Sequence, residues 1–389
     1  MMDLRNLPAE LNPHERCEER RARIEKELNC SLTASSIDEK KLGHAEEKNC
    51  EHMFGAVPIP VGYAGPLNVT FSNKENTTVH LPLATVEGAL VASVNRGCKA
   101  ISQSGGATAK SVYHGMSRSM CFKVNKDGER SLIGFIESKS DDWKKVGEET
   151  SEHLKILSST IDHQNGYVFL TLNCDTDQAM GMNMVTIASA TIGNWIKENA
   201  ESPVEFVTAA GNVDSDKKPS KRTHDLGRGY DVTAEVILKS EVIESVLKSD
   251  PKLILEVAKG KLETGSKLAG ALGKNMHSAN VIAALYLATG QDAAHTVEGS
   301  LTDTSVEEVS EGLKVSVRCP AILVGVRGGG TTLPAQKECL DLILNGKSSL
   351  HPCKQLAESI GAAVLAGEIS LLAAQASHHL AKAHEELGR

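Results

Sequence analysis

Aromatic residues are scarce in this chain of 389 residues, with only 6 Phe, 5 Tyr and 2 Trp. Because few large rings are available to fill an interior, the core must consist mainly of Ala, Val, Leu and Ile, with helices in close contact. Hydrophobic residues still make up 40% of the chain, which is ordinary for a globular protein. The length exceeds what one compact core usually holds, so we expect two or three domains, including the case of one inserted in another.

The chain also lacks a basic excess. Its formal net charge of -8 argues against a general nucleic-acid binder, so an anionic ligand would need a local basic pocket. The nine cysteines have no CxxC pair or Cys/His cluster, and we therefore predict reduced thiols and no metal site. No secretory signal is recognisable, and a cytoplasmic location is expected. The longest uncharged stretch, residues 178–196, contains Gln, Asn, Gly, Ser and Thr, which favours a buried helix over a membrane span.

The composition changes along the chain. Residues 1–50 are dense in charge, and "ERCEERRARIEKEL" has the opposite-charge spacing of a helix. Residues 54–69 carry glycines and prolines at close intervals, which predicts a buried or ligand-lining loop without regular structure. Residues 77–102 predict a strand, a turn at Glu87-Gly88 and a helix, so that Glu87 lies near a helix N-terminus, where the helix dipole favours a negative charge.

The second half alternates between strand and helix patterns. Residues 119–209 contain strands such as "YVFLTL" and a long helix near residues 181–198, which indicates an inserted α/β domain. After it, "DVTAEVIL" and "LKVSVRC" predict strands on either side of helices that are rich in small residues. The last segment predicts a helix in which Ala and Gly allow close contacts.

Four ionisable residues stand beside glycine or other small residues: Glu87, Lys217, Asp292 and His384. An amine, two carboxylates and an imidazole together could stabilise an oxyanion and move protons. Taken singly, each signal is weak, because such residues are usually a cap, a turn residue or a solvated surface residue. Lys217 lies in "GNVDSDKKPSKR" (residues 211–222), which by itself reads as a surface loop.

Two glycine-rich segments remain, "DQAMGMNM" (residues 177–184) and "GVRGGGTTLP" (residues 325–334). Glycines let a backbone approach a phosphate or a nicotinamide ring closely. Neither segment is GxGxxG after a strand, and no Walker sequence occurs, so a dinucleotide would not be held by a Rossmann fingerprint. A lone triple glycine is also typical of a flexible turn.

As an ordered set, these segments resemble the 3-hydroxy-3-methylglutaryl-coenzyme A (HMG-CoA) reductase family, of its class I type. "EHMFGAVPIPVGYAGPL" is similar to the family's substrate segment, matching at Glu51 and Gly55 and departing at residues 52–54. "TVEGALVASVNRGCKAI" is similar to its Glu-Gly signature. "GMSR", "AMGMNM", "GNVDSDKKP", "HSANVIAALYLATGQDAA" and "GVRGGGT" follow in the family's order. The resemblance covers roughly residues 50–389.

The resemblance implies reduction of a thioester to mevalonate and free CoA, with two reduced nicotinamides consumed through hemithioacetal and aldehyde stages. Carried over, Lys217 would polarise the thioester carbonyl and hold the oxyanion. Glu87 would donate a proton at the aldehyde stage, and Asp292 would tune both through its charge. His384 would protonate the departing CoA thiolate.

The resemblance also implies binding residues. Arg118 and Lys261 would bind the substrate carboxylate, and Asn280 would form hydrogen bonds in the active site. The residues on the CoA side would be Ser93, Asn95, Arg96 and Lys99. Those for the nicotinamide cofactor are Met180, Gly181, Met182, Asn183, Ser151, Gly328, Gly329, Gly330 and Thr331. NADPH is the expected cofactor, with NADH as the alternative.

Three departures from the family pattern bear on these roles. Gln178 replaces an acidic cofactor contact, which is then lost or supplied by Asp177. Ala210 stands where many relatives have a serine. Glu152 stands where the family has an arginine for the 2′-phosphate, and a glutamate suits a ribose diol better.

We therefore predict an α/β (α+β) protein of three parts. These are a helical N-terminal unit (residues 1–50), a large substrate domain with a long central helix (residues 51–118 and 210–389), and an inserted ferredoxin-like cofactor domain (residues 119–209). The family implies a homodimer with a shared active site, within a homotetramer. Two alternatives stay open: a reductase of another acyl-CoA thioester, and a non-catalytic CoA-binding relative.

Overall fold

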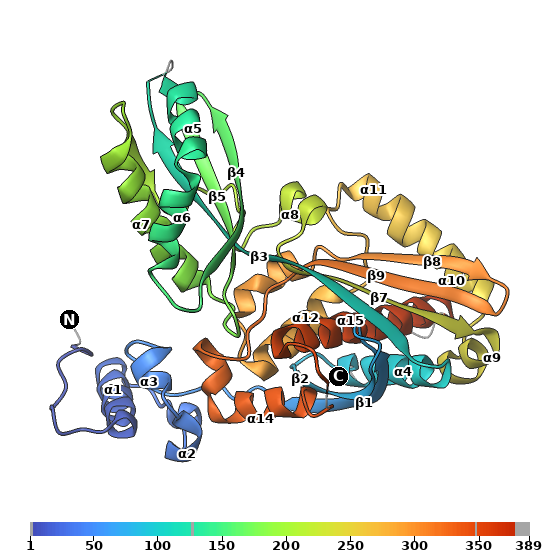
Figure 1. Cartoon of the computed structure of the whole chain (residues 1–389). Helices are drawn as coiled ribbons and strands as arrows, with labels where there is room; N and C mark the ends of the chain where they lie inside the picture. Colours follow the sequence, from blue (N-terminus) through green and yellow to red (C-terminus); the bar gives the residue numbers. More distant parts are fainter. Residues whose placement is uncertain (1–2, 126–127, 347, 378–389) are drawn as a thin grey trace.

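The computed structural model describes residues 3–125, 128–346 and 348–377 (Figure 1). It is a mixed α/β fold, as predicted, with one sheet of six strands and a smaller sheet that branches from it. Buried apolar side chains form three separate clusters, one in the large helix-and-sheet part, one in the smaller sheet and one in the N-terminal unit.

The six-stranded sheet has the order β2-β1-β3-β7-β9-β8. Its strands, in chain order, are β1 Val61–Thr70, β2 Asn76–Ala84, β3 Ala107–Lys123, β7 Gly229–Lys239, β8 Asp303–Val309 and β9 Gly312–Ile322. Neighbouring strands are antiparallel except β1 and β3, which pair in parallel through Val69 and Thr70. The alternation in "DVTAEVIL" and "LKVSVRC" therefore does mark strands, in β7 and β9.

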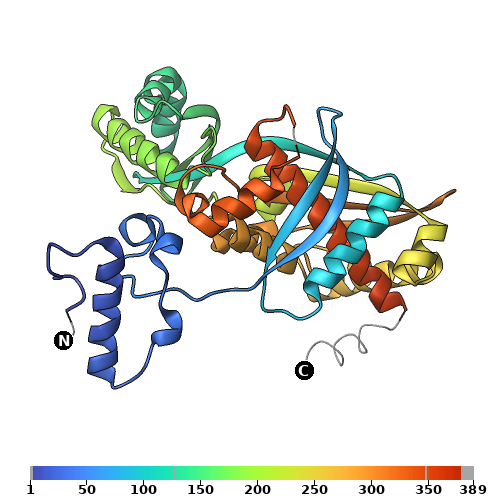
Figure 2. The ribbon, with the colours of Figure 1, turned by 90° about the horizontal axis from the view of Figure 1, so that it is seen from below.

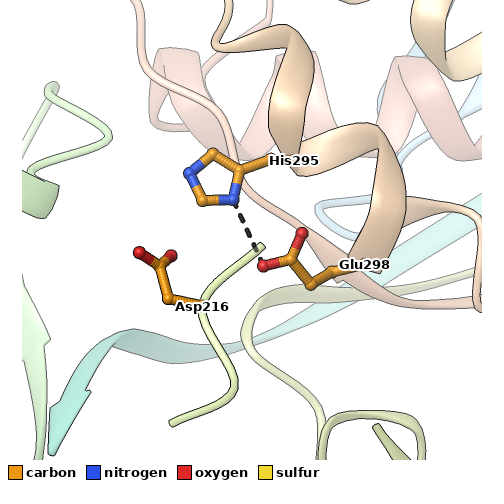
Figure 3. Close-up of side chains that lie close together, drawn as sticks. All are labelled: Asp216, His295 and Glu298. Atoms are coloured by element: carbon orange, nitrogen blue, oxygen red, sulfur yellow. Dashed lines mark hydrogen bonds and ion pairs between the residues drawn. The ribbon is translucent and has the colours of Figure 1, made fainter. Parts of the chain in front are cut away.

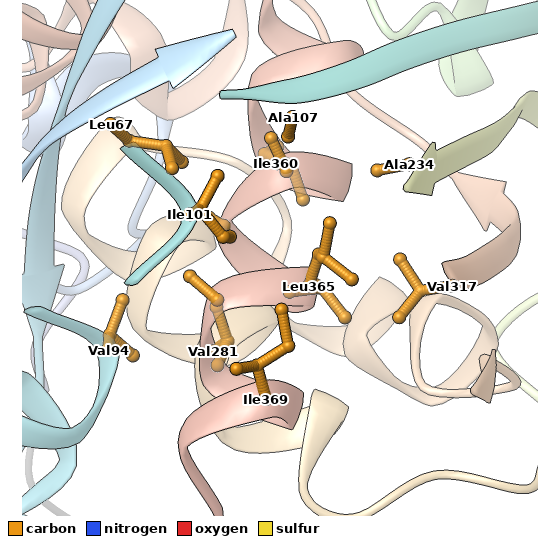
Figure 4. Close-up of a cluster of buried hydrophobic side chains, with 14 of the residues drawn as sticks. Leu67, Val94, Ile101, Ala107, Ala234, Val281, Val317, Ile360, Leu365 and Ile369 are labelled. Carbon is orange, nitrogen blue, oxygen red and sulfur yellow. The ribbon is translucent and has the colours of Figure 1, made fainter. Parts of the chain in front are cut away.

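Helix α15 (Pro352–Ala376) is the long central helix that was predicted for the large part (Figure 4). It packs against the sheet, against α4 (Leu90–Gln103) and against α12 (Ser278–Thr289), and Figure 2 shows α4 running beside it. By length and composition α15 could cross a membrane, but 94% of its most apolar window is buried inside the protein, as in the core helix of a globular domain.

The smaller sheet shares β3 with the larger one. The second half of β3 pairs with β5 (Tyr167–Asp175) and β6 (Glu205–Thr208), and β4 (Lys155–Gln164) pairs with β5. Helices α5 (Glu129–Ser138), α6 (Ser140–Glu148) and α7 (Met182–Asn199) pack together with this sheet. The resulting βαββαβ order with antiparallel strands is ferredoxin-like, and the predicted helix near residues 181–198 is α7.

The N-terminal unit consists of α1 (Pro13–Leu28), α2 (Glu39–Leu42) and α3 (Ala45–Lys48), set apart from the two sheets (Figure 2). Asn12 and Glu15 form a capping box at the start of α1, and Pro13 occupies its first turn. The N-terminal unit contacts the start of α14 (Pro334–Ile343). Leu333, the N-cap residue of α14, packs against the buried apolar cluster of this unit.

Short elements complete the chain. They are the helices α8 Lys221–Leu226, α9 Ser240–Val242, α10 Pro251–Val257, α11 Ser266–Ala269 and α13 Thr296–Gly299, the 3-10 turns η1 Thr33–Ser35, η5 Ala293–His295 and η6 Gly329–Thr332, and the π-helical segments η3 Ile243–Leu247 and η4 Ala258–Gly265.

The prediction that residues 54–69 lack regular structure is wrong for their second half. Residues 61–69 belong to β1, which pairs with β2 on one side. The glycines and the proline are tolerated because the register shifts between Ala64 and Leu67, and Pro66 lies inside this irregularity, where no ladder N–H is required.

Small residues allow two core helices, α4 and α15, to approach each other closely. A Cβ atom added to Gly97 of α4 would lie 1.9 Å from the carbonyl oxygen of Ala366 in α15. The two helix backbones therefore touch, as the low aromatic content requires.

We predict that Gly97→Ala lowers the free energy of unfolding by about 3 kcal/mol, because the methyl group forces α4 and α15 apart. Gly134→Ala is the matched control, since it also adds a methyl group inside a helix but meets no atom within 4 Å. This control should leave stability unchanged or raise it by about 0.5–1 kcal/mol. Urea unfolding of both variants measures the difference, and equal midpoints would contradict the close contact.

Candidate active site

A cavity of about 1060 Å³ opens where the two sheets and the N-terminal unit meet. Two of the predicted catalytic residues, Lys217 and Asp292, line it together with Arg118, predicted for the substrate carboxylate. All of the predicted cofactor residues line it too: Ser151, Met180, Gly181, Met182, Asn183, Gly328, Gly329, Gly330 and Thr331. These residues come from segments far apart in the sequence. The fold thus brings together what the sequence showed only as separate motifs.

Glycine allows the chain to turn into this cavity at the start of α7. Gly181 has φ +84, and a Cβ atom there would lie 2.3 Å from the side chain of Thr176. A residue with a side chain would be strained in this backbone conformation and would collide with its neighbour. The backbone of residues 180–183 is consequently exposed to any ligand in the cavity.

Lys217 and Asp292 form an ion pair at the cavity wall, with Lys217 Nζ 2.8 Å from Asp292 Oδ2. Asp292 is the N-cap of η5, and its Oδ1 accepts the Ala294 N–H at 3.0 Å. Burial alone would raise the pKa of Asp292, but the hydrogen bonds from Lys217 and Ala294 and the charge of His295 hold it below its usual value. The carboxylate therefore stays ionised and keeps the ammonium in place.

Lys217 has an unusual backbone conformation, with φ +55 in a residue other than glycine. Its main-chain N–H donates to Glu298 Oε1 at 2.5 Å, and Glu298 is fully buried. The turn that presents the ammonium is thus fixed by a buried carboxylate. The lysine segment that resembled a solvated loop is anchored through its backbone, with no apolar side chain needed.

Arg118 reaches the same cavity from β3. Its Nη1 lies 3.4 Å from both Asp214 Oδ2 and Asp216 Oδ2, and its Nε donates to Thr186 at 3.1 Å. Burial raises the pKa of Asp214 in spite of the nearby arginines. For Asp216, Arg228 and Arg118 outweigh burial and lower the pKa.

Arg228 contacts the two carboxylates that lie next to the Lys217 turn, those of Asp216 and Glu298. Its Nη1 donates to Glu298 Oε1 at 2.9 Å and to Asp216 Oδ1 at 3.1 Å. Asp216, His295 and Glu298 also bring potential metal-ligand atoms within 4.8 Å of one another (Figure 3). Because the guanidinium already lies on both carboxylates, the cluster carries its own cation, and we assign it no metal.

Sequence reasoning missed this charged layer. Asp214, Asp216, Arg228, His295 and Glu298 were not singled out, although two of the acids directly precede Lys217 in "DSDKK". The spacing of His295 and Glu298, three apart in a short helical turn, was the other available signal.

The other predicted site residues lie elsewhere. Glu87 is exposed just before α4 and does not line the cavity. Ser93 and Arg96 of α4 contact Ser370 of α15, at 3.0 Å from its hydroxyl in both cases. The remaining residues are spread over this part of the chain: Asn95, whose side chain accepts the Gly65 N–H, exposed Lys99, Lys261 at 3.3 Å from Gln375, and Asn280 in the first turn of α12. His384 lies outside the described residues.

All three departures lie in the described residues, and Ala210 is exposed, with its N–H donating to the Thr208 hydroxyl at 3.1 Å. Asp177, suggested as a substitute for the missing acid at Gln178, pairs instead with His153 at 3.2 Å and His351 at 3.5 Å. These three residues line a neighbouring cavity of about 500 Å³, and Glu152 lines it too. Neither acid lines the larger cavity. In this structure Asp177 therefore does not stand in for the acid that is missing at Gln178, and Glu152 lines a different cavity from Ser151.

Sequence comparisons with known proteins identify the family to which the chain belongs. The family model for hydroxymethylglutaryl-coenzyme A reductase matches residues 16–389. The chain is 43% identical to the 3-hydroxy-3-methylglutaryl-coenzyme A reductase of Methanocaldococcus jannaschii, covering 91% of this chain and 87% of that protein. It is 40% identical to the enzyme of the same name from Haloferax volcanii, covering 99% and 96%.

A solved structure shares the fold. The NADPH-bound class II 3-hydroxy-3-methylglutaryl-CoA reductase from Streptococcus pneumoniae superposes with a TM-score of 0.69 over 92% of this chain and 96% of that chain, at 18% identity. The family model and the two relatives confirm, at the level of the family, the resemblance seen in the ordered motifs. The chain belongs to the hydroxymethylglutaryl-coenzyme A reductase family.

Proposed function

We propose that the chain reduces HMG-CoA to mevalonate and free CoA, with two molecules of NADPH consumed. The observation that carries this proposal is the Lys217–Asp292 ion pair at 2.8 Å, in the same cavity as the two glycine-rich cofactor segments. A positioned ammonium is what a thioester carbonyl needs when hydride adds to it and negative charge develops on oxygen. The archaeal relatives carry the matching name.

In this mechanism Lys217 donates a hydrogen bond to the carbonyl oxygen of the thioester and then to the oxyanion of the hemithioacetal. Two NADPH molecules, bound one after the other, would each supply one hydride. Collapse of the hemithioacetal breaks the C–S bond, and His384 gives the leaving thiolate its proton. Lys217 then polarises the aldehyde, and Glu87 protonates the oxygen as the second hydride arrives. Two hydrides and two protons are consumed, so the atoms and charges balance.

Arg118 favours a substrate with a distal carboxylate over other acyl-CoA thioesters. It lies in the same cavity as Lys217, and two carboxylates and Thr186 fix its guanidinium. A guanidinium has five N–H donors, so one held in this way can still bind a further carboxylate from the substrate. The geometry also disfavours a non-catalytic relative, since a protein that only binds CoA does not need an ammonium fixed at the cofactor segments.

The full reaction is tested by counting NADPH oxidised for each free thiol released from HMG-CoA. We expect a ratio of two, since the thioester passes through the aldehyde to the alcohol. Lys217→Met should lower kcat by about 1000-fold or more. A ratio of one would mean that the reaction stops at the aldehyde, and no oxidation would contradict the proposed function.

A second copy of the chain is the proposed source of Glu87. Glu87 does not line the cavity, although the proposed chemistry needs its proton beside Lys217. Exposed apolar side chains surround its segment, with Val57 84%, Val61 54% and Val86 87% exposed. An apolar surface of this kind next to an incomplete site fits an isologous contact in a homodimer, which could assemble further into the predicted homotetramer.

Mixing two inactive variants tests the shared site. Glu87→Gln and Lys217→Met should each be inactive alone. Random exchange of subunits should restore about a quarter of the wild-type activity, because half of the dimers are then mixed and each mixed dimer has one intact site. If each chain formed its site alone, every site in the mixture would carry one defect and no activity would return.

For the cofactor, the charges of the cavity support NADPH. Lys48 of the N-terminal unit and Arg327, beside the triple glycine, both line the cavity. Neither forms an ion pair with any of the described residues, whereas Lys217 and Arg118 are paired with carboxylates. Together with Ser151, these cations suit the phosphates of a dinucleotide. Glu152 lines the neighbouring cavity, so its negative charge does not oppose a 2′-phosphate bound in the larger cavity.

We predict that Lys48→Ala raises the KM for the cofactor about 10-fold and leaves kcat unchanged, because one charge-assisted contact to phosphate is lost. A rise for NADPH alone would place Lys48 at the 2′-phosphate, and an equal rise for NADH would place it at the pyrophosphate. Lys41→Ala is the control, an exposed lysine on α2 that does not line the cavity. An unchanged KM for both cofactors would contradict the contact.

Several finer points belong to the same proposal. The ordered motifs resemble class I, while the structural neighbour is a class II enzyme whose 18% identity supports the fold alone. We propose the three-part division by function, with β3 passing from the substrate part into the cofactor part. A cytoplasmic location and a reaction without a metal are also part of the proposal.

A further inference from the structure

His295 and Glu298 form a buried pair directly behind the Lys217–Asp292 ion pair. Both are fully buried, and His295 Nδ1 lies 3.4 Å from Glu298 Oε1 (Figure 3). They lie on η5 and α13, the turn that follows Asp292. Neither residue lines the cavity, so neither contacts a ligand there.

The pair contacts both members of the ion pair, each by a different route. Glu298 Oε1 accepts the main-chain N–H of Lys217 at 2.5 Å, which holds the left-handed turn. His295 Nε2 lies 3.7 Å from Asp292 Oδ2, the oxygen that also receives the Lys217 ammonium. The histidine and the glutamate thus connect the backbone and the side-chain partner of one lysine.

The two ring nitrogens of His295 face two different carboxylates. A neutral imidazole has one N–H donor and one acceptor, so it would place a lone pair against one of these oxygens. Only a ring protonated at both nitrogens can donate toward both. His295 Nε2 is buried without a hydrogen-bond partner, and the carboxylate oxygen Asp292 Oδ2 lies 3.7 Å from it.

The charge balance of the cluster agrees with a protonated ring. The charged groups packed around His295 are the three carboxylates Asp216, Asp292 and Glu298 and the two cations Lys217 and Arg228. A third cation makes the cluster neutral, and buried charges are tolerated only when they are paired. Arg118 and Asp214 form the adjoining pair and do not change this balance.

We infer that His295 is a positioning residue for the proposed reduction: protonated at both ring nitrogens, it bridges Glu298 and Asp292 and keeps the Asp292 carboxylate ionised against the Lys217 ammonium. This inference rests on the proposed function. In this arrangement His295 touches no substrate atom and acts only through the ion pair. Its loss should therefore affect the transition state, where the ammonium holds the oxyanion, more than the binding of either substrate.

The test compares His295→Leu, His295→Gln and a matched control in steady-state kinetics. His295→Leu should lower kcat on the order of 100-fold, with the KM for HMG-CoA and NADPH within about 3-fold of wild type. His295→Gln keeps an N–H donor without the charge, so it should recover much of the lost kcat. His224→Gln is the control, because His224 also lies between two carboxylates, Asp225 and Asp303, but outside the cavity.

The pH profile separates positioning from a general loss of structure. Asp292 must be ionised to hold Lys217, so kcat falls as the pH drops through its lowered pKa. Without the positive charge of His295, that pKa rises, and the acid limb of kcat in His295→Gln should move to higher pH. The acid limb of His224→Gln should stay where it is in the wild type.

A second measurement does not depend on activity. The ¹⁵N-labelled ring of His295, assigned by its absence in His295→Gln, should show imidazolium shifts at pH 7. A neutral ring, or an unchanged kcat and acid limb in His295→Leu, would overturn the inference. If the wild type itself did not oxidise NADPH with HMG-CoA, the proposed function would fail instead, so the two failures are distinguishable.

Discussion

The hydrogen bond from the main-chain N–H of Lys217 to the buried carboxylate of Glu298 is the constraint on which the site depends. It holds a non-glycine residue in a left-handed turn, and this turn directs the ammonium to Asp292 at the cavity wall. Arg228 balances the charge of Glu298 from behind. Removing either side of such a buried pair leaves an uncompensated charge, which typically costs about 3–5 kcal/mol. The position of the ammonium is therefore determined by buried charges and only indirectly by hydrophobic packing.

The architecture brings the residues proposed for the substrate and for the cofactor to one cavity. Strand β3 runs through both sheets, so the part with the ferredoxin-like order and the part built on α15 share one continuous strand (Figure 1). The cavity lies where these parts meet, and the N-terminal unit closes a third side through Lys48 and Asn49. Close contacts such as that of Gly97 with Ala366 keep the helices under the sheet compact although aromatic residues are few. Precise placement of the lysine turn therefore rests on a densely packed base.

The sequence predicted secondary structure with a local signal better than it predicted contacts between distant residues in the site. Strand alternation identified β7 and β9, because this signal is local. The resemblance to the family assigned residues 180–183 to the cofactor, and these residues do line the cavity. The register irregularity at Ala64 and Leu67 was not predictable, since it depends on pairing with β2. The charged layer of Asp214, Asp216, Arg228 and Glu298 was also missed, because its members are up to 84 residues apart and become partners only through the fold. Glu87 was predicted from the family pattern, and a single chain does not bring it to Lys217.

The most direct measurement is a crystal structure of the full chain with HMG-CoA and oxidised NADP bound together. The account predicts that the thioester carbonyl oxygen lies about 3 Å from Lys217 Nζ, with the nicotinamide against the backbone of residues 180–183. Glu87 from a second copy should face the same carbonyl group. If the Lys217 ammonium pointed into solvent in every subunit, or if HMG-CoA bound outside this cavity, the account would be contradicted.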